Sequence, residues 1–129
     1  MKILDTDHCI ALLRGRLTLQ GRVDPAEVLA VTAISVGELT HGAAKSARPA
    51  ENLARVDVLL ASVTMLPFDE TTARLFGTHK ADLERQGMRL SDLDLQIAAT
   101  ALHASSPLVT HNTRHFQRIS GLLLEDWLV

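Results

Sequence analysis

Acidic side chains follow several apolar segments of this 129-residue chain, at positions where they could bind a cation or a phosphate. Asp5 and Asp7 come directly after the first apolar run. Glu38 follows a second run, Asp94 lies near the start of a strongly apolar helix, and Asn112 follows a late apolar run. If the preceding strands are parallel, their carboxyl ends meet at one sheet edge, where open α/β sheets bind ligands. Three or four oxygen donors gathered there would form a Mg²⁺ or Mn²⁺ site.

The same acids also fit a purely structural interpretation, because Asp and Ser are favoured at helix N-termini. Ser35 and Glu38 have the spacing of a capping box, in which Glu38 would accept a hydrogen bond from the backbone N–H of Ser35. The other candidate caps are Asp7 before a helix from His8, Asp69, and Ser91 with Asp94. Spacing alone therefore leaves metal binding and helix capping both open.

Composition predicts a single intracellular domain, with hydrophobic residues making up 47% of the chain. No apolar run approaches the roughly 18 residues of a membrane span, and no secretory signal pattern is found, so we expect a cytoplasmic protein without membrane contact. The single Cys9 excludes an internal disulfide, and its apolar neighbours favour a buried thiol. A net charge of −2 argues against nucleic-acid binding through a broad cationic surface. It does not argue against an enzyme that cuts nucleic acid.

Short apolar runs alternate with helical patterns along the chain, which predicts an α/β fold with a mostly parallel sheet of about five strands, flanked by helices. The expected strands are 3–4, 28–34, 63–68, 108–109 and 122–124. The expected helices are 35–46, 50–61, 70–86, closed by Gly87, and 91–104. The last of these is apolar or small on nearly every face from Leu95 onward, so we expect it to be buried on most sides. Residues 15–25 are expected to form a loop or a short irregular helix within the domain.

The sequence resembles a PIN domain over residues 1–129, and specifically the VapC toxins of bacterial type II toxin–antitoxin pairs. Each matching motif is short, but their order and spacing are specific to this group. The motifs are Ile3-Leu4-Asp5-Thr6-Asp7, Ile34-Ser35-Val36-Gly37-Glu38-Leu39 with Gly42, Asp94 to Ala101, Val109-Thr110-His111-Asn112-Thr113-Arg114-His115-Phe116, and Gly121-Leu122 with Glu125-Asp126-Trp127.

This resemblance implies an endoribonuclease that depends on Mg²⁺ or Mn²⁺. Asp5, Glu38 and Asp94 fall on the family's most regular acidic positions, and they are expected to bind the metal. Asn112 falls where many PIN domains have a fourth acid, and it adds an oxygen ligand without negative charge. Asp92 is a candidate for supplying that missing charge. Thr6 and Ser35 resemble the small hydroxyl residues that line PIN sites, and Thr110 is expected to position a water molecule or an acid.

The resemblance also implies partners: RNA as substrate, a cognate VapB-like antitoxin that inhibits the site, a homodimer, and a toxin–antitoxin hetero-oligomer. Attack by a metal-activated water predicts products with a 5′-phosphate and a 3′-hydroxyl. The histidines beside the motifs, His8, His111 and His115, are expected to be hydrogen-bonded or to face the substrate rather than to act as general acids. For the antitoxin we expect a groove along helices 35–46 and 50–61.

Other classes of protein remain as alternatives. Asp5 and Asp7 have the Asp-x-Asp spacing of haloacid-dehalogenase-like phosphatases, although His8 stands where those enzymes have glycine. A PIN module that binds antitoxin without catalysis is a second alternative. A receiver-like module is a third, but Asp57 is expected in the middle of a helix and no lysine follows Lys80.

Overall fold

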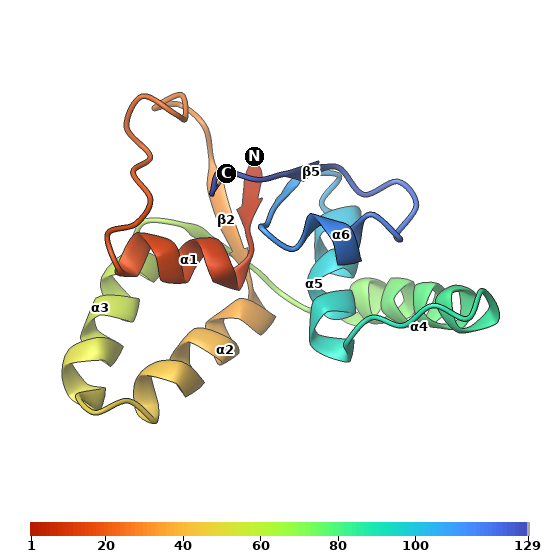
Figure 1. The fold of residues 1–129 in the computed structure, drawn as a ribbon, viewed down its shortest axis with the longest axis horizontal. Helices are drawn as coiled ribbons and strands as arrows, with labels where there is room; N and C mark the ends of the chain where they lie inside the picture. Colours follow the sequence, from red (N-terminus) through yellow and green to blue (C-terminus); the bar gives the residue numbers. More distant parts are fainter. Residues whose placement is uncertain (129) are drawn as a thin grey trace.

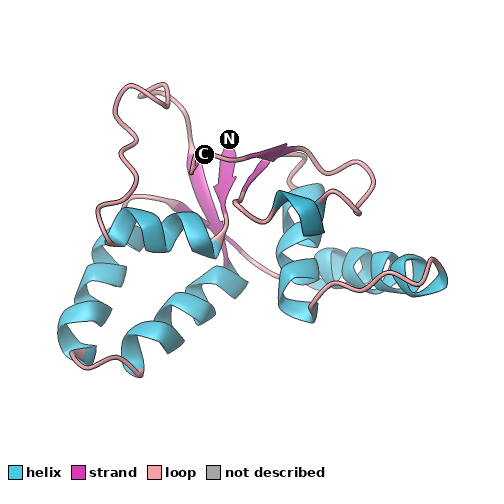
Figure 2. Ribbon diagram, viewed as in Figure 1, coloured by secondary structure: helices cyan, strands magenta, loops and turns pink. Residues whose placement is uncertain are grey.

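A computed structural model describes residues 1–128, in which five parallel strands form one sheet with the order β3-β2-β1-β4-β5. The strands are β1 (Lys2–Leu4), β2 (Leu29–Thr32), β3 (Thr64–Leu66), β4 (Leu108–Val109) and β5 (Leu124–Glu125). The helices in the described residues are α1 (Thr6–Leu13), α2 (Ala33–Ala44), α3 (Pro49–Ala61), α4 (Glu70–Arg85), α5 (Asp92–His103) and α6 (Thr113–Phe116). The predicted α/β fold with a parallel sheet is confirmed (Figure 2).

Helices cover both faces of the sheet, with α1, α2 and α3 on one side and α4, α5 and α6 on the other (Figure 1). Successive strand residues point to opposite faces. Ile3 therefore packs in the core under α5, whereas Leu4 packs in the core under α1 to α3. Helix α5 is buried along most of its length, as its apolar composition predicted. Two cores thus hold β1 from both faces.

The chain reverses its direction of strand addition next to β1. It builds outward from β1 through β2 to β3, and then returns to place β4 on the other side of β1. Asp5 directly follows β1, and its backbone N–H donates to the carbonyl of Val109 at 2.9 Å. Thr110 directly follows β4. Both residues therefore lie at the carboxyl edge of the switch point, where sheets of this type bind ligands.

The structure corrects the expected start of the first two helices. Helix α1 begins at Thr6 rather than His8, and its N-cap is Asp5 rather than Asp7. Helix α2 begins at Ala33 rather than Ser35, because Thr32 is its N-cap and accepts a hydrogen bond from the Ser35 N–H at 3.1 Å. Strand β2 consequently ends two residues earlier than predicted. Both N-caps have extended backbone angles, so each strand passes into a helix without a loop.

The remaining differences are small. The short helix α6 was not predicted, and β5 begins two residues later than expected. Strand β4 has its predicted bounds, and Asp69 and Ser91 cap α4 and α5 as expected. Gly87 follows α4 with a positive φ of 70°, as predicted for the glycine that closes this helix.

Candidate acidic site at the sheet switch point

Asp5 is a buried carboxylate at the centre of the carboxyl edge, with only 6% of its surface exposed. Its Oδ1 accepts the backbone N–H of Thr6 at 2.8 Å, and its Oδ2 accepts the Thr110 hydroxyl at 2.7 Å. The second bond crosses from β1 to β4, so it fixes the carboxylate at the switch point. Asp5 is therefore both a helix cap and a member of the candidate site.

The pKa of Asp5 is raised from 3.8 to about 6. Burial is the main cause, because it removes the charged form from water. The negative charges of Asp7 and Asp94 raise the pKa further, while the hydrogen bonds from Thr110 and Thr6 act in the opposite direction. Ionisation of Asp5 therefore lowers the free energy of unfolding, because the charge is buried and is repelled by two other acids. A cation bound to Asp5 would offset this loss of stability.

Glu38 reaches the site through Thr6 and not through the predicted capping box. The Thr6 hydroxyl donates to Glu38 Oε1 at 2.7 Å, and Thr6 Oγ1 lies 2.9 Å from Ser35 Oγ. Because the single Thr6 proton goes to the carboxylate, the Ser35 hydroxyl is the donor in the second contact. The capping-box prediction for Ser35 and Glu38 is wrong, since Thr32 already binds the Ser35 N–H. Glu38 is half-buried and has a second carboxylate oxygen left for other contacts.

Asp94 lies in the first turn of α5, where Ser91 Oγ caps the helix by accepting the Asp94 N–H at 3.2 Å. Its charge acts on Asp5, which places the two carboxylates in the same electrostatic environment. Asp92 differs, because it is exposed and forms an ion pair with Lys80 at 2.9 Å. Asp94 therefore acts electrostatically on Asp5, whereas the charge of Asp92 is paired with Lys80.

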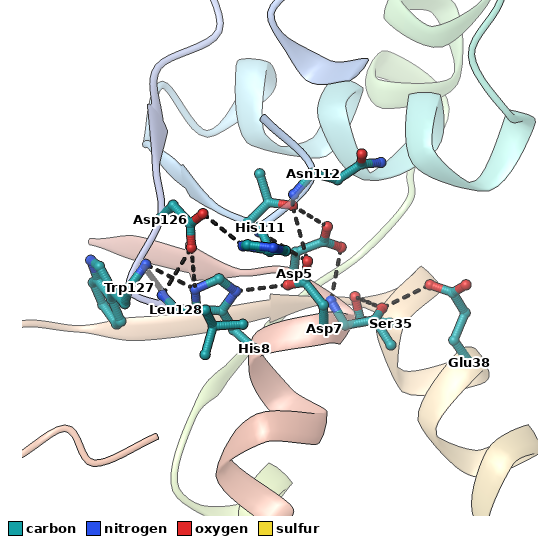
Figure 3. A network of polar contacts seen from close by, with 12 residues as sticks. Asp5, Asp7, His8, Ser35, Glu38, His111, Asn112, Asp126, Trp127 and Leu128 are labelled. Atoms are coloured by element: carbon teal, nitrogen blue, oxygen red, sulfur yellow. Dashed lines mark hydrogen bonds and ion pairs between the residues drawn. The ribbon is translucent and has the colours of Figure 1, made fainter. Parts of the chain in front are cut away.

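Asn112 is connected to the site through its backbone. Its N–H donates to Thr110 Oγ1 at 3.0 Å, and its carbonyl accepts the backbone N–H of His115. Figure 3 shows its side-chain amide at the margin of the network, outside the drawn contacts. Thr110 is the more central residue, because its hydroxyl accepts from Asn112 and donates to Asp5.

The expected acids come to one edge of the sheet without forming a tight ligand cluster. Within residues 1–128, no group of three His, Cys, Asp or Glu side chains is arranged to hold a metal ion. In the same residues, none of the ion pairs involves Asp5, Glu38 or Asp94. These three carboxylates are therefore not neutralised by a described lysine, arginine or histidine.

A second set of contacts lies beside these acids, and no sequence pattern predicted it. His8 is fully buried, and its ring contacts Asp7 and the backbone N–H of Trp127. Asp126 binds the His111 ring at 2.8 Å (Figure 3). Asp126 and Trp127 belong to one of the segments on which the resemblance in the sequence rests, but nothing in their residue types shows that this segment folds back onto α1. The expectation that His8 is a hydrogen-bonded imidazole is confirmed.

Cys9 is also fully buried, as its neighbours predicted. Burial raises the pKa of its thiol to about 12, and the charges of Asp5 and Asp7 contribute to the increase. Cys9 is therefore protonated at neutral pH and takes no part in nucleophilic chemistry.

Fold and site together define a parallel α/β domain with acidic residues at its switch point. The family model of the PIN domain matches residues 2–122. The chain is 35% identical to the tRNA(fMet)-specific endonuclease VapC of Shigella flexneri, covering 97% of this chain and 96% of that protein. It is also 35% identical to ribonuclease VapC2 of Haemophilus influenzae, covering 98% and 97% respectively.

The crystal structure of VapBC2 from Rickettsia felis, bound to a DNA fragment from their promoter, contains a similar fold. The TM-score is 0.90 at 26% identity, and the match covers 98% of both chains. This chain belongs to the PIN domain family, and within it to the VapC group. Among the described residues, no helix has the length and apolar character needed to cross a membrane.

Proposed function

We propose that the chain is the toxin of a type II toxin–antitoxin pair and acts as an endoribonuclease that requires Mg²⁺ or Mn²⁺. The observation that carries the proposal is the buried Asp5 carboxylate, whose pKa is raised by burial and by the charges of Asp7 and Asp94, and which has no described cationic partner. The similarity to VapC ribonucleases over nearly the whole chain supports RNA as the substrate. A transfer RNA is the first substrate to test, because the Shigella relative is named for one.

The chemistry of these side chains fits a divalent metal. Carboxylate oxygens are the preferred ligands of Mg²⁺ and Mn²⁺, and neutralisation of Asp5 would offset the cost of burying its charge. Asp5, Glu38 and Asp94 would hold the ion, with Asn112 as an auxiliary oxygen ligand. When bound, such an ion lowers the pKa of a coordinated water and stabilises the charge that develops on the phosphate.

The chain's own residues orient these carboxylates. Thr110 fixes Asp5 Oδ2, and Thr6 fixes Glu38 Oε1, so each carboxylate has one oxygen held by a hydroxyl. The other oxygen of Glu38 is available to accept a proton from the attacking water. Asp5 has less freedom, because the Thr6 N–H occupies its Oδ1. Glu38 is therefore our candidate for orienting water, and Asp5 for binding the metal. The expected products carry a 5′-phosphate and a 3′-hydroxyl.

A covalent phosphatase mechanism is not favoured by the contacts of Asp7. Such a mechanism requires the second acid of the Asp-x-Asp pair to serve as a free general acid beside the nucleophile. Asp7 instead accepts hydrogen bonds from the His8 ring at 2.7 Å and the His111 N–H at 2.9 Å. Burial works to raise the pKa of Asp7, but these bonds outweigh it and hold the pKa below its ordinary value. The receiver-like alternative is likewise not favoured, since Asp57 lies within α3.

The groove between α1, α2 and α3 suits the antitoxin. It has a volume of about 310 Å³, and its lining includes the apolar side chains of Leu13, Leu39 and Val56. Lys45 and Arg55 also line it, so we propose that an amphipathic antitoxin helix with acidic flanks occupies the groove. We further propose that an arginine or lysine of the antitoxin binds the acidic site and neutralises its carboxylates. Homodimerisation stays a prediction from the family resemblance.

RNA cleavage by the purified chain tests the proposal. We expect cleavage with Mg²⁺ or Mn²⁺, none with EDTA, and 5′-phosphate ends when the products are sequenced. Asp5→Asn should abolish cleavage, whereas Asp57→Asn, an exposed change on α3, should not alter it. A 2′,3′-cyclic phosphate product would refute water attack. If expression of the Asp5→Asn variant in cells inhibited growth as fully as wild type, the alternative of a module that binds without catalysis would be supported instead.

A further inference from the structure

His8 lies in the first turn of α1 with none of its surface exposed, and both ring nitrogens have partners. Nδ1 lies 2.7 Å from Asp7 Oδ1, and Nε2 lies 3.1 Å from the backbone nitrogen of Trp127. The Trp127 indole ring also meets the imidazole edge-on, with centroids 6.2 Å apart. His8 thus joins α1 to a segment 119 residues further along the chain.

The Trp127 contact determines the form of the ring. A backbone N–H can only donate, so Nε2 must accept and carries no proton. The imidazole is therefore neutral, its single proton is on Nδ1, and Nδ1–H donates to Asp7. The Asp126 carboxylate lies 3.7 Å from Nε2, outside hydrogen-bond distance, and its Oδ1 accepts the Leu128 N–H instead. One tautomer accounts for both short contacts.

Asp7 continues the connection toward the acidic site. Its Oδ2 accepts the His111 N–H at 2.9 Å and lies 3.4 Å from the Thr110 hydroxyl. Thr110 in turn donates to Asp5. Asp7 therefore ties α1 to the loop that follows β4, and this loop positions the partner of Asp5. Figure 3 shows these contacts as one network that runs from Trp127 to Asp5.

We infer that His8 is a positioning residue for the acidic site: its neutral imidazole holds Asp7 against the loop after β4 and attaches residues 126–128 to α1. This inference rests on the proposed ribonuclease function. The ring has two separate tasks. Its Nδ1–H orients Asp7, which keeps Thr110 in place to bind Asp5. Its Nε2 anchors the segment that contains Trp127.

Two substitutions separate these tasks. An asparagine amide has its nitrogen at the distance of Nδ1, so His8→Asn keeps a donor for Asp7 and loses the acceptor for Trp127. A glutamine amide reaches to the distance of Nε2, so His8→Gln keeps an acceptor for Trp127 and loses the donor for Asp7. The variants are compared after correction of each rate for the folded fraction.

We expect His8→Gln to lower kcat for RNA cleavage at least about tenfold with little change in KM, as for partners that orient metal ligands. His8→Asn should keep kcat within about threefold of wild type. It should instead expose Trp127, which is the single tryptophan and can be followed by acrylamide quenching. In an Asp7→Ala background, His8→Gln should cause no further loss of kcat, because the residue it acts through is gone.

Equal losses of kcat in both variants would overturn the inference, since a purely structural role affects both alike. A protonated Nε2 in the ¹⁵N NMR spectrum of His8 would also overturn it. The NMR and quenching measurements need no RNA. If wild type cuts no RNA while Nδ1 is protonated and only His8→Asn exposes Trp127, the proposed function fails and the two contacts assigned to His8 stand.

Discussion

Replacement of Asp5 by asparagine should stabilise the metal-free protein while it removes activity. The asparagine side chain can keep both contacts of the carboxylate: its oxygen accepts the Thr6 N–H, and its amide donates to Thr110 Oγ1. Only the charge is lost. Because burial and the neighbouring acids make this charge unfavourable, its removal should raise the free energy of unfolding.

The size of the effect follows from the pKa of Asp5. A folded-state pKa of about 6, against the ordinary value of 3.8, corresponds to a loss of at most about 3 kcal/mol in the free energy of unfolding when Asp5 is ionised. Between these values the native chain binds more protons than the unfolded chain, so the unfolding free energy falls as the pH rises. The penalty is absent below about pH 4 and fully present above about pH 6. Asp5→Asn should therefore match wild type near pH 4 and exceed it at about pH 7.5.

Urea unfolding in EDTA at a series of pH values measures this difference. Other acids also titrate in the window, so the informative quantity is variant minus wild type at each pH. Asp57→Asn is the matched control, because it removes an exposed charge on α3. Addition of Mg²⁺ at about pH 7.5 should stabilise wild type and leave Asp5→Asn unchanged. A variant-minus-wild-type difference that does not depend on pH would refute the burial argument.

Three further changes test the rest of the site and its partner. Thr6→Val removes the donor to Glu38, so kcat should fall about tenfold, and steady-state kinetics that show no loss would contradict the role of Thr6. Asn112→Asp adds a carboxylate next to the site and should lower the Mg²⁺ concentration needed for half-maximal cleavage, whereas an unchanged midpoint would exclude Asn112 as a ligand. Lys45→Glu should weaken antitoxin binding about tenfold in calorimetry, while Arg22→Glu, a charge reversal in a loop outside the groove, should not; equal effects would contradict the groove.

The overall fold could be predicted from the residues alone, but the helix starts could not. The alternation of apolar runs and helical patterns correctly indicated a parallel sheet. This alternation does not locate the N-caps Asp5 and Thr32, because an N-cap has extended backbone angles and prolongs the preceding strand. Where a strand passes directly into a helix, no turn residue marks the boundary. Because α2 begins at Ala33, Ser35 and Glu38 both lie inside the helix, and their spacing only imitates a capping box.

The contacts of the site were less predictable than its position. Parallel strands bring Asp5 and Thr110 to one edge whatever their side chains, so strand order suffices to place them. The role of His8 depends on Trp127, and no periodicity reports a contact between residues so distant in sequence. Family resemblance distinguishes Asp5, Glu38 and Asp94 from the other acids, and their role as metal ligands stays a prediction.

The switch point also affects how this protein can be made in a cell. β1 leaves the ribosome before its neighbour β4 and the Trp127 segment, which are synthesised about a hundred residues later or more. Until then Asp5 has neither Thr110 nor the ordered Asp7 beside it. A nascent chain therefore carries no assembled acidic site. An RNA-cutting protein built in this way cannot attack the RNAs used in its own synthesis until the segment around Trp127 has been made.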